Sequence, residues 1–180
     1  MAGHSDNELQ LPTFSDPVKV LIVIAPYYKA IAEAQMDAAL QVLEAAGVEH
    51  EVVEVTGSLE IAPAITLANR LSNFDGYVAL GCVIRGATSH YDIVINESAR
   101  GITMLGLQGL AIGNGIITVE TIEQAEERAD AGRLNTAGAA AQAALHLIAL
   151  ARKWSRTEKG VGFVPGSYRI AVSGEGPASA

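Results

Sequence analysis

Val18-Lys-Val-Leu-Ile-Val-Ile-Ala25 is the stretch of sequence that decides the fold. Every residue in it except Lys19 is apolar and most are β-branched, which is typical of a strand buried on both faces. Residues 29–46 follow, rich in alanine, with apolar residues at helical spacing and with Gly47 as a suitable stop. A buried strand followed at once by a helix indicates the start of a parallel α/β fold.

The same alternation of strand and helix repeats along the chain. The predicted strands are residues 18–25, 50–55, 76–83 and 111–118, and the predicted helices are residues 29–46, 58–71, 90–108, 120–130 and 135–154. Short connections between strands and helices indicate a parallel sheet covered by helices on both faces. Because the crossovers in such sheets are right-handed, we expect a flavodoxin-like, three-layer αβα sandwich around a four-stranded sheet.

Composition sets the number of domains. A chain of 180 residues, with 49% hydrophobic and 18% charged residues, suits one domain with a full core. We expect a flexible arm at residues 1–16, with a small apolar island at Leu9–Phe14, and a folded domain at residues 17–156. The glycine-containing tail at residues 157–180 is also expected to be flexible.

Charge and cysteine content narrow the possible partners. The net charge of −8 argues against nucleic acid as a partner and against a basic membrane patch. No apolar run approaches the roughly 20 residues of a membrane span, and the start of the chain does not resemble a secretion signal. Cys82 is the only cysteine, so no intrachain disulfide can form, which fits a reducing compartment. The sequence therefore predicts a soluble, cytoplasmic protein.

One loop, Gly81-Cys-Val-Ile-Arg-Gly-Ala-Thr-Ser-His-Tyr-Asp92, carries most of the polar groups where a ligand would bind. It lies beyond the carboxyl end of a predicted strand, where such sheets bind ligands, and its amides stand at a helix N-terminus that suits an anion. Arg85 could add charge, and His90 could transfer protons near neutral pH. Spacing alone fits equally well a simpler alternative, in which Thr88 or Ser89 only caps the helix and His90 is a solvated first-turn residue.

Other positions leave two interpretations open. Ser58 and Glu60, after the second predicted strand, could bind polyol hydroxyls, although helix capping is the favoured explanation. Pro26-Tyr-Tyr28 could stack on a flat heterocycle or pack beneath a helix. Arg128 and Arg133 flank a helix break and could reach a phosphate, or serve as ordinary surface residues.

The sequence gives little indication of redox or metal chemistry. Cys82 is expected to be buried rather than nucleophilic. No cysteine and histidine group has metal-ligand spacing, and neither GxGxxG nor a P-loop lysine occurs, so we expect no metal and no cofactor. The residues alone thus indicate an α/β protein with a site for a phosphorylated, aromatic small molecule and one acid–base histidine.

Four segments resemble motifs of the lumazine synthase family. Residues 81–92 resemble its signature G-x-V-I-R-G-x-T-x-H-[FY]-[DE], and residues 56–63 resemble P-G-[AS]-[FLY]-E-[IL]-P apart from Thr56 and an additional Ala62. Residues 96–101 resemble N-E-[AS]-[AS]-[KR]-G, and residues 115–125 resemble G-[IV]-[LV]-T-x-[ED]-x-x-E-Q-A. The resemblance extends from about Val18 to Trp154, and it identifies residues 17–156 as a lumazine synthase domain.

The resemblance implies a reaction and an assembly. In this family 5-amino-6-ribitylaminouracil condenses with 3,4-dihydroxy-2-butanone 4-phosphate, without a cofactor, to give 6,7-dimethyl-8-ribityllumazine, phosphate and water. It also implies a homo-oligomer with active sites at subunit interfaces, in which the N-terminal arm adds a strand to a neighbour's sheet. A relative that binds lumazine or flavin with little turnover is the alternative. A flavodoxin-like FMN carrier and a purely structural cage protein fit the motifs less well.

Single positions carry roles implied by the same resemblance. His90 matches the proton-transfer catalyst, Tyr27 the aromatic that stacks on the heterocycle, and Arg128 a phosphate ligand from the adjacent subunit. The full substrate-binding set is Tyr27, Gly57, Ser58, Leu59, Glu60, Cys82, Val83, Ile84, Gly86, Ala87, Thr88, Asn114 and Arg128. Within it Ser58 and Glu60 match the ribityl site, Val83 and Ile84 the pyrimidine site, and Gly86 to Thr88 the phosphate site.

Departures from the family pattern bear on the pocket, on phosphate binding and on the assembly. Asn114 stands where an aromatic often forms part of the pocket wall. Residues 130–138 differ from the family's usual loop and lack its lysine near Thr136, so phosphate binding would depend more on Arg128 or Arg133. Because this loop lies where icosahedral members pack pentamers together, we expect a pentamer or a dimer of pentamers rather than a 60-subunit shell.

Overall fold

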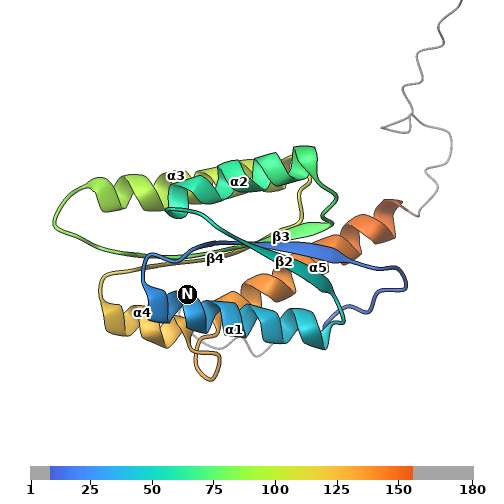
Figure 1. The fold of residues 1–180 in the computed structure, drawn as a ribbon, viewed down its shortest axis with the longest axis horizontal. Helices are drawn as coiled ribbons and strands as arrows, with labels where there is room; N and C mark the ends of the chain where they lie inside the picture. The colour runs from blue at the N-terminus through green and yellow to red at the C-terminus, as the bar shows by residue number, and fades with distance from the viewer. Residues whose placement is uncertain (1–8, 156–180) are drawn as a thin grey trace, which may run out of the picture.

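A four-stranded parallel sheet forms the middle layer of the computed structural model, which describes residues 9–155 (Figure 1). Its strands, in spatial order, are β2 (Glu49–Glu54), β1 (Lys19–Ala25), β3 (Gly76–Ile84) and β4 (Ile112–Val119). β1 and β3 are central, and β1 is buried along nearly its whole length, as its run of apolar residues predicted. β2 and β4 are the edges of the sheet.

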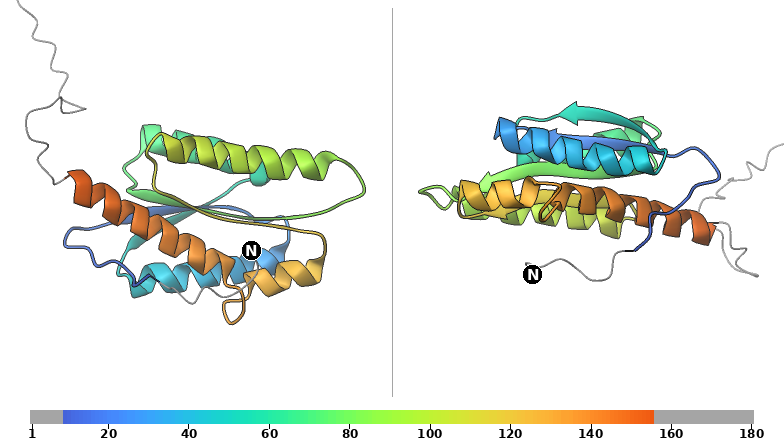
Figure 2. Two further views of the ribbon diagram at one scale, coloured as in Figure 1. Left: turned by 180° about the vertical axis from the view of Figure 1, so that it is seen from behind. Right: turned by 90° about the horizontal axis from the view of Figure 1, so that it is seen from below.

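Helices cover both faces of the sheet. On one face lie α2 (Ser58–Leu71) and α3 (His90–Leu107); on the other lie α1 (Lys29–Ala45), α4 (Ile122–Ala129) and α5 (Thr136–Ser155). Figure 2 shows from behind that α5 crosses the sheet on the same side as α1 and α4. The predicted three-layer, flavodoxin-like αβα sandwich with a four-stranded parallel sheet is therefore confirmed.

The predicted ends of the helices and strands agree with the structure to within two residues. The largest difference is at α4, which starts at Ile122 rather than residue 120. Thr121 takes the extended N-cap conformation there, and its side chain accepts a hydrogen bond from the Gln124 amide, so the helix cannot include it. α1 ends where expected, because Gly47 adopts a positive φ of 64°.

Small residues bring α5 close to the sheet. A Cβ atom on Gly113 of β4 would overlap the backbone carbonyl of Ala140, and one on Gly115 would lie 3.1 Å from the Ala140 Cβ. The glycines thus remove the side-chain layer that normally separates a helix from a strand. This contact lies on the face where α1 and α5 form the larger of the two main apolar clusters.

The described part of the arm lies against its own subunit. Leu11 and Phe14 pack on the apolar cluster between the sheet and helices α1 and α5, and the Arg152 guanidinium lies 5.5 Å from the Phe14 ring centroid. Residues 9–16 form no strand, and residues 1–8 lie outside the described range, as does the predicted tail from residue 157. Addition of the arm to a neighbour's sheet therefore stays a prediction. Within residues 9–155, no helix has the length and apolar character to cross a membrane.

Candidate functional site

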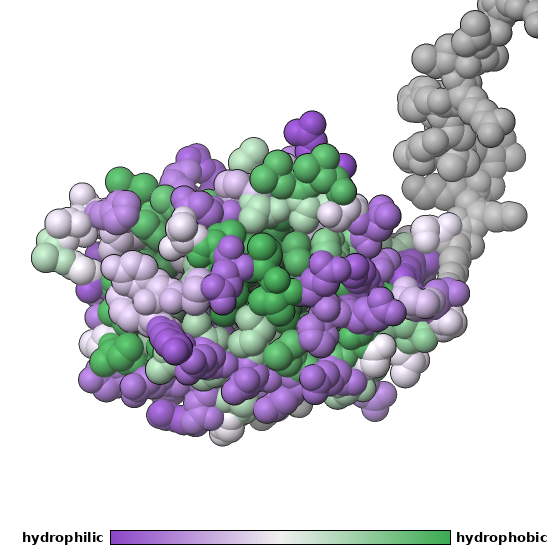
Figure 3. Space-filling view, viewed as in Figure 1, coloured by the Kyte–Doolittle hydropathy of each residue, from purple (hydrophilic) through white to green (hydrophobic). Residues whose placement is uncertain are grey.

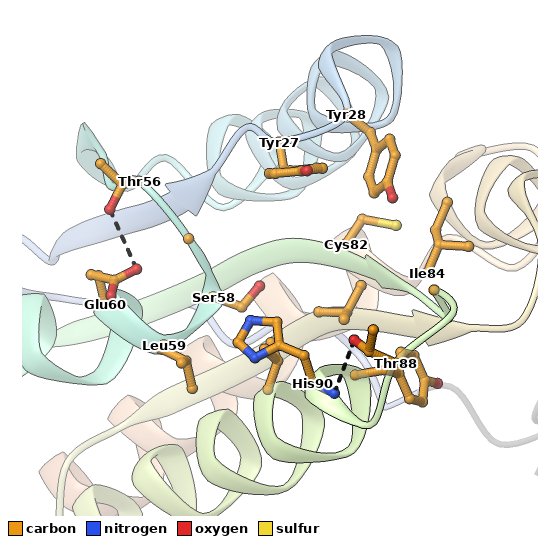
Figure 4. Close-up of a pocket in the computed structure, with 15 residues that line it drawn as sticks. Tyr27, Tyr28, Thr56, Ser58, Leu59, Glu60, Cys82, Ile84, Thr88 and His90 are labelled. Carbon is orange, nitrogen blue, oxygen red and sulfur yellow. Dashed lines mark hydrogen bonds between the residues drawn. The ribbon is translucent and has the colours of Figure 1, made fainter.

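A pocket of about 470 Å³ opens at the carboxyl ends of β1 and β3, the edge at which the sequence predicted a site (Figure 4). Its wall draws on the β1–α1 turn, the β2–α2 turn, the end of β3 and the first turns of α3. The lining residues are Tyr27, Tyr28, Thr56, Gly57, Ser58, Leu59, Glu60, Cys82, Val83, Ile84, Gly86, Thr88, His90, Tyr91 and Val94. Parallel topology explains this convergence, because all strands end at the same edge.

The end of β3 forms an apolar floor. Cys82, Val83 and Ile84 pair with β4, and the Arg85 amide continues that ladder by donating to the Val119 carbonyl at 2.9 Å. Cys82 is only 6% exposed, and burial raises the pKa of its thiol to about 11. The thiol is therefore protonated near neutral pH and forms part of the wall, as predicted, rather than a nucleophile.

The N-terminus of α3 presents polar groups to the pocket. Ser89 occupies the N-cap position but its side chain makes no capping hydrogen bond, and the Thr88 hydroxyl accepts only a long 3.4 Å bond from the His90 amide. Capping, the simpler of the two sequence interpretations, is thus largely unrealised. First-turn amides without capping partners can bind an anion that enters the pocket.

His90 is exposed, and in Figure 4 its imidazole ring extends from α3 toward the side of the pocket formed by Ser58 and Leu59. Within the described residues the ring makes no hydrogen bond. An imidazole that is open to the pocket on this edge can reach a bound ligand and exchange protons with it.

The N-terminus of α2 forms the opposite wall. Gly57, not Ser58, is the N-cap, and Ser58 is the first helical residue with its side chain buried in the pocket wall. The capping interpretation of Ser58 is therefore wrong by one position. Glu60 is exposed and accepts a 3.4 Å hydrogen bond from the Thr56 hydroxyl, while Gly57 leaves room for its carboxylate, which would lie 2.9 Å from a Cβ at that position.

The two tyrosines after β1 separate into different roles. Their rings meet edge to face with centroids 5.0 Å apart. Tyr27 is 75% exposed and leaves a ring face open to the pocket, whereas Tyr28 packs against the cluster that contains Cys82. Burial, followed by the proximity of Cys82 and Tyr27, raises the pKa of the Tyr28 hydroxyl. Packing within the fold thus holds for Tyr28, while stacking of a heterocycle on Tyr27 stays a prediction.

Three predicted site residues do not line the pocket of the described chain. Ala87 is in the loop between Gly86 and Thr88 but outside the lining. Asn114 is the third residue of β4, far from that strand's carboxyl end, and its side-chain oxygen accepts from the Ile116 amide at 3.1 Å. Arg128 is in the last turn of α4, where its guanidinium donates to the Gln124 carbonyl at 3.0 Å. A single chain therefore does not bring Asn114 or Arg128 to this pocket.

Sequence reasoning missed four lining residues. Val94 follows His90 by four positions and Tyr91 by three, so helical spacing could have placed Val94 beside both on α3. Thr56 lay inside a quoted motif, and Tyr28 was named with Tyr27 but given no site role. Among residues 9–155, no group of three or more histidine, cysteine, aspartate or glutamate side chains is arranged to hold a metal ion.

The pocket combines an exposed tyrosine ring, a hydroxyl and carboxylate wall, an apolar floor, a helix N-terminus and a histidine. Comparison of the sequence with known proteins shows which family shares these residues. Residues 17–152 match the sequence profile of the family described as 6,7-dimethyl-8-ribityllumazine synthase. A protein of that name from Jannaschia sp. (strain CCS1) is 69% identical over 172 residues, covering 95% of this chain and 97% of the relative.

Two further relatives carry the same name. The one from Sphingopyxis alaskensis is 53% identical over 131 residues, 73% of this chain and 93% of the relative. The one from Nitrobacter winogradskyi is 48% identical over 162 residues, 87% of this chain and 99% of the relative. The region that matches the family, residues 17–152, includes every loop that forms the pocket.

Proposed function

The chain belongs to the 6,7-dimethyl-8-ribityllumazine synthase family, and from this membership we propose how its pocket serves the family's reaction. The enzyme is a transferase of riboflavin biosynthesis. It condenses 5-amino-6-ribitylaminouracil with 3,4-dihydroxy-2-butanone 4-phosphate, giving 6,7-dimethyl-8-ribityllumazine, phosphate and water. The observation that carries the assignment of this reaction to the pocket is that the segments at residues 56–60 and 81–92 face one another across it.

The uracil substrate binds between the first and third strands. Its flat ring stacks on the exposed face of Tyr27 and rests on Val83 and Ile84, since aromatic and apolar surfaces favour a heterocycle. Its ribityl chain lies along the start of α2, where the Ser58 hydroxyl and the Glu60 carboxylate meet its hydroxyl groups. The opposite placement would bring the polyol onto the apolar floor and leave its hydroxyl groups without partners, which is unfavourable.

The butanone phosphate binds at the N-terminus of α3. Gly86, Ala87 and Thr88 offer backbone amides and a hydroxyl, and the positive end of the helix dipole adds to the attraction. In a chain of net charge −8, such a local arrangement is needed to hold an anion. Arg128 of an adjacent subunit supplies the cation, since the arginine does not line the pocket of its own chain and donates there to the Gln124 carbonyl.

Catalysis consists mainly of holding two substrates together. The uracil amine adds to the ketone and water leaves to form an imine, the imine then loses phosphate, and a second amine addition with loss of water closes the ring. Alignment of the reactants supplies much of the rate acceleration. His90, next to the phosphate loop, moves protons during these steps and contributes about 10²–10⁴-fold.

The functional unit is a homopentamer or a dimer of pentamers with its sites at subunit interfaces. Figure 3 shows apolar side chains gathered on the face that carries the β2 edge, and Val52 and Val53 of that strand are 46% and 39% exposed. An unpaired edge with exposed apolar residues favours a partner strand. The arm of a neighbour would provide it by leaving the position in which Leu11 and Phe14 pack on their own subunit. A cytoplasmic location fits the single cysteine.

Mixing the purified protein with both substrates and following lumazine by absorbance tests the reaction. We expect formation well above the uncatalysed background. Background-level formation with ligand still bound would instead favour the flavin- or lumazine-binding relative.

Mixed oligomers test the shared site. His90→Ala and Arg128→Ala proteins, each impaired alone, should regain activity when their subunits are mixed and reassembled, because some interfaces then combine both wild-type residues. Arg128→Ala alone should chiefly raise the KM for the butanone phosphate. No recovery on mixing, with confirmed subunit exchange, would place both residues in one subunit's site.

A further inference from the structure

Arg85 has an environment that the reaction as described above does not use. Its Nε donates to Glu120 Oε2 at 2.7 Å, its Nη1 donates to Asp92 Oδ1 at 3.2 Å, and its Cζ lies 4.1 Å from the centroid of the Tyr91 ring. The guanidinium therefore joins three parts of the carboxyl edge, namely the β3–α3 loop, the first turn of α3 and the segment after β4. It does not line the pocket.

The contacts of Arg85 hold the chain on both sides of His90. Tyr91 and Asp92 are the two residues that follow His90, and Arg85 holds one by stacking and the other by an ion pair. Tyr91 is only 7% exposed and itself lines the pocket. On the preceding side, the Arg85 amide is fixed to the Val119 carbonyl. The contacts of Arg85 thus restrain residues 86–90 at both ends, through its backbone before the loop and through its side chain after it.

We infer that Arg85 is a positioning residue, which holds the phosphate loop and His90 in their reactive arrangement without touching either substrate. This inference rests on the proposed function of the pocket. Two guanidinium donors are already engaged and one face is covered by the Tyr91 ring, so binding of the substrate phosphate would compete with these contacts.

The network has more effect on geometry than on stability. The side chains of Arg85, Asp92 and Glu120 are 41%, 52% and 55% exposed, and exposed ion pairs contribute little to folding. A small displacement of reacting groups, however, can slow an enzyme by up to about a hundredfold. Loss of Arg85 should therefore change turnover much more than thermal stability.

Steady-state kinetics of full-length variants test this inference. Arg85→Gln should lower kcat about tenfold or more, with little change in either KM and a melting temperature within a few degrees of wild type. Arg85→Lys keeps the charge but not the planar fork, so it should recover only part of kcat. Arg100→Gln is the matched control, because it removes an exposed arginine from α3 whose partner, Glu97, is on the same helix; it should leave both constants unchanged.

Three results would overturn the inference. A large rise in the KM for the butanone phosphate with unchanged kcat would make Arg85 a phosphate ligand, unchanged kinetics would make it a surface ion pair, and full recovery by lysine would reduce its role to charge. Should Arg85→Gln fail to fold, Glu120→Gln, which keeps the arginine but weakens its shortest bond, must lower kcat in the same way. An inactive wild-type protein would instead refute the proposed function.

Discussion

The two ends of the sheet differ. At the amino ends of the strands, the closed end, Arg152 joins separate segments by hydrogen bonds. At the carboxyl ends, the open end, Arg85 lies beside the pocket. Arg152 donates to the carbonyls of Asp16 and Pro17 and to the Asp75 carboxylate at 2.6–3.0 Å, with the Phe14 ring beside it. The arrangement resembles that of Arg85, which also combines several oxygen acceptors with an aromatic ring. At the amino end, however, the acceptors belong to the chain entering β1 and to the turn before β3, and none of them lines the pocket at the carboxyl edge.

This difference indicates where the fold gains its stability. Gly76 and Gly113, near the amino ends of β3 and β4, allow α5 to approach the sheet closely. The carboxyl edge, by contrast, exposes Tyr27, Glu60 and His90. Residues that must meet substrates cannot also satisfy one another within the fold, so the packing at the other end has to stabilise both. Substitutions at the two ends should therefore separate activity from stability.

His90→Ala should have the largest effect, and only on activity. We expect kcat to fall about 10²–10⁴-fold, equivalent to roughly 3–5 kcal/mol, because a proton-transfer group is lost. The melting temperature and the oligomer mass should not change, because His90 is exposed and its ring makes no hydrogen bond within the described residues. Kinetics and calorimetry on one preparation measure both; unchanged turnover would remove His90 from the mechanism.

Gly113→Ala should have the largest effect on stability. The new methyl group would overlap the Ala140 carbonyl, a backbone atom that can move only if α5 moves, and we expect a loss of about 3 kcal/mol or failure to fold. Gly106→Ala is the matched control: nothing lies within 4 Å of a Cβ there, and alanine is the better helix former, so stability should rise by up to about 1 kcal/mol. Urea unfolding of both variants decides; equal effects would disprove the close packing of α5.

The sequence predicted well what is local in the chain. The alternation of apolar strands and helices placed every element, and the rule that ligands bind at the carboxyl edge selected the loops that form the pocket. Contacts between distant residues escaped it. Arg152 and Asp75 are 77 positions apart, and buried Gln35 donates to the carbonyls of Gly81 and Gly115, 46 and 80 positions away.

Residues that do not reach the pocket of their own chain form a second limit. Asn114 and Arg128 carry roles that the family resemblance implies, yet neither lines the pocket of its own chain. Neither hydropathy nor spacing can reveal this, because both describe neighbours along one chain. The Arg85 network, in contrast, lay within the signature, but sequence could not decide whether the arginine contacts carboxylates or a phosphate.

Arg152→Ala should weaken the closed end moderately. Its hydrogen bonds join partly exposed groups, and after allowing for solvent screening we expect the free energy of unfolding to fall by about 1–2 kcal/mol. Turnover should stay as in wild type, which would contrast with the effect of Arg85→Gln. Arg100→Ala, which removes only an exposed pair with Glu97, is the control and should cost less than about 0.5 kcal/mol. Lost activity at unchanged stability would contradict the division between the two ends.

Thr56→Val should have the smallest effect, and it tests whether Thr56 orients the Glu60 carboxylate in the pocket. The Thr56 hydroxyl donates to Glu60 at 3.4 Å, a long and exposed hydrogen bond that can contribute only about 0.5 kcal/mol to the orientation of the carboxylate. The KM for the uracil substrate should therefore rise about twofold, while the KM for the butanone phosphate stays constant. Thr66→Val is the control, because its hydroxyl bonds the Ala62 carbonyl within α2, outside the pocket lining. If both KM values rose together, Thr56 would act on the pocket as a whole, and the separation of ribityl and phosphate sites along its two walls would have to be abandoned.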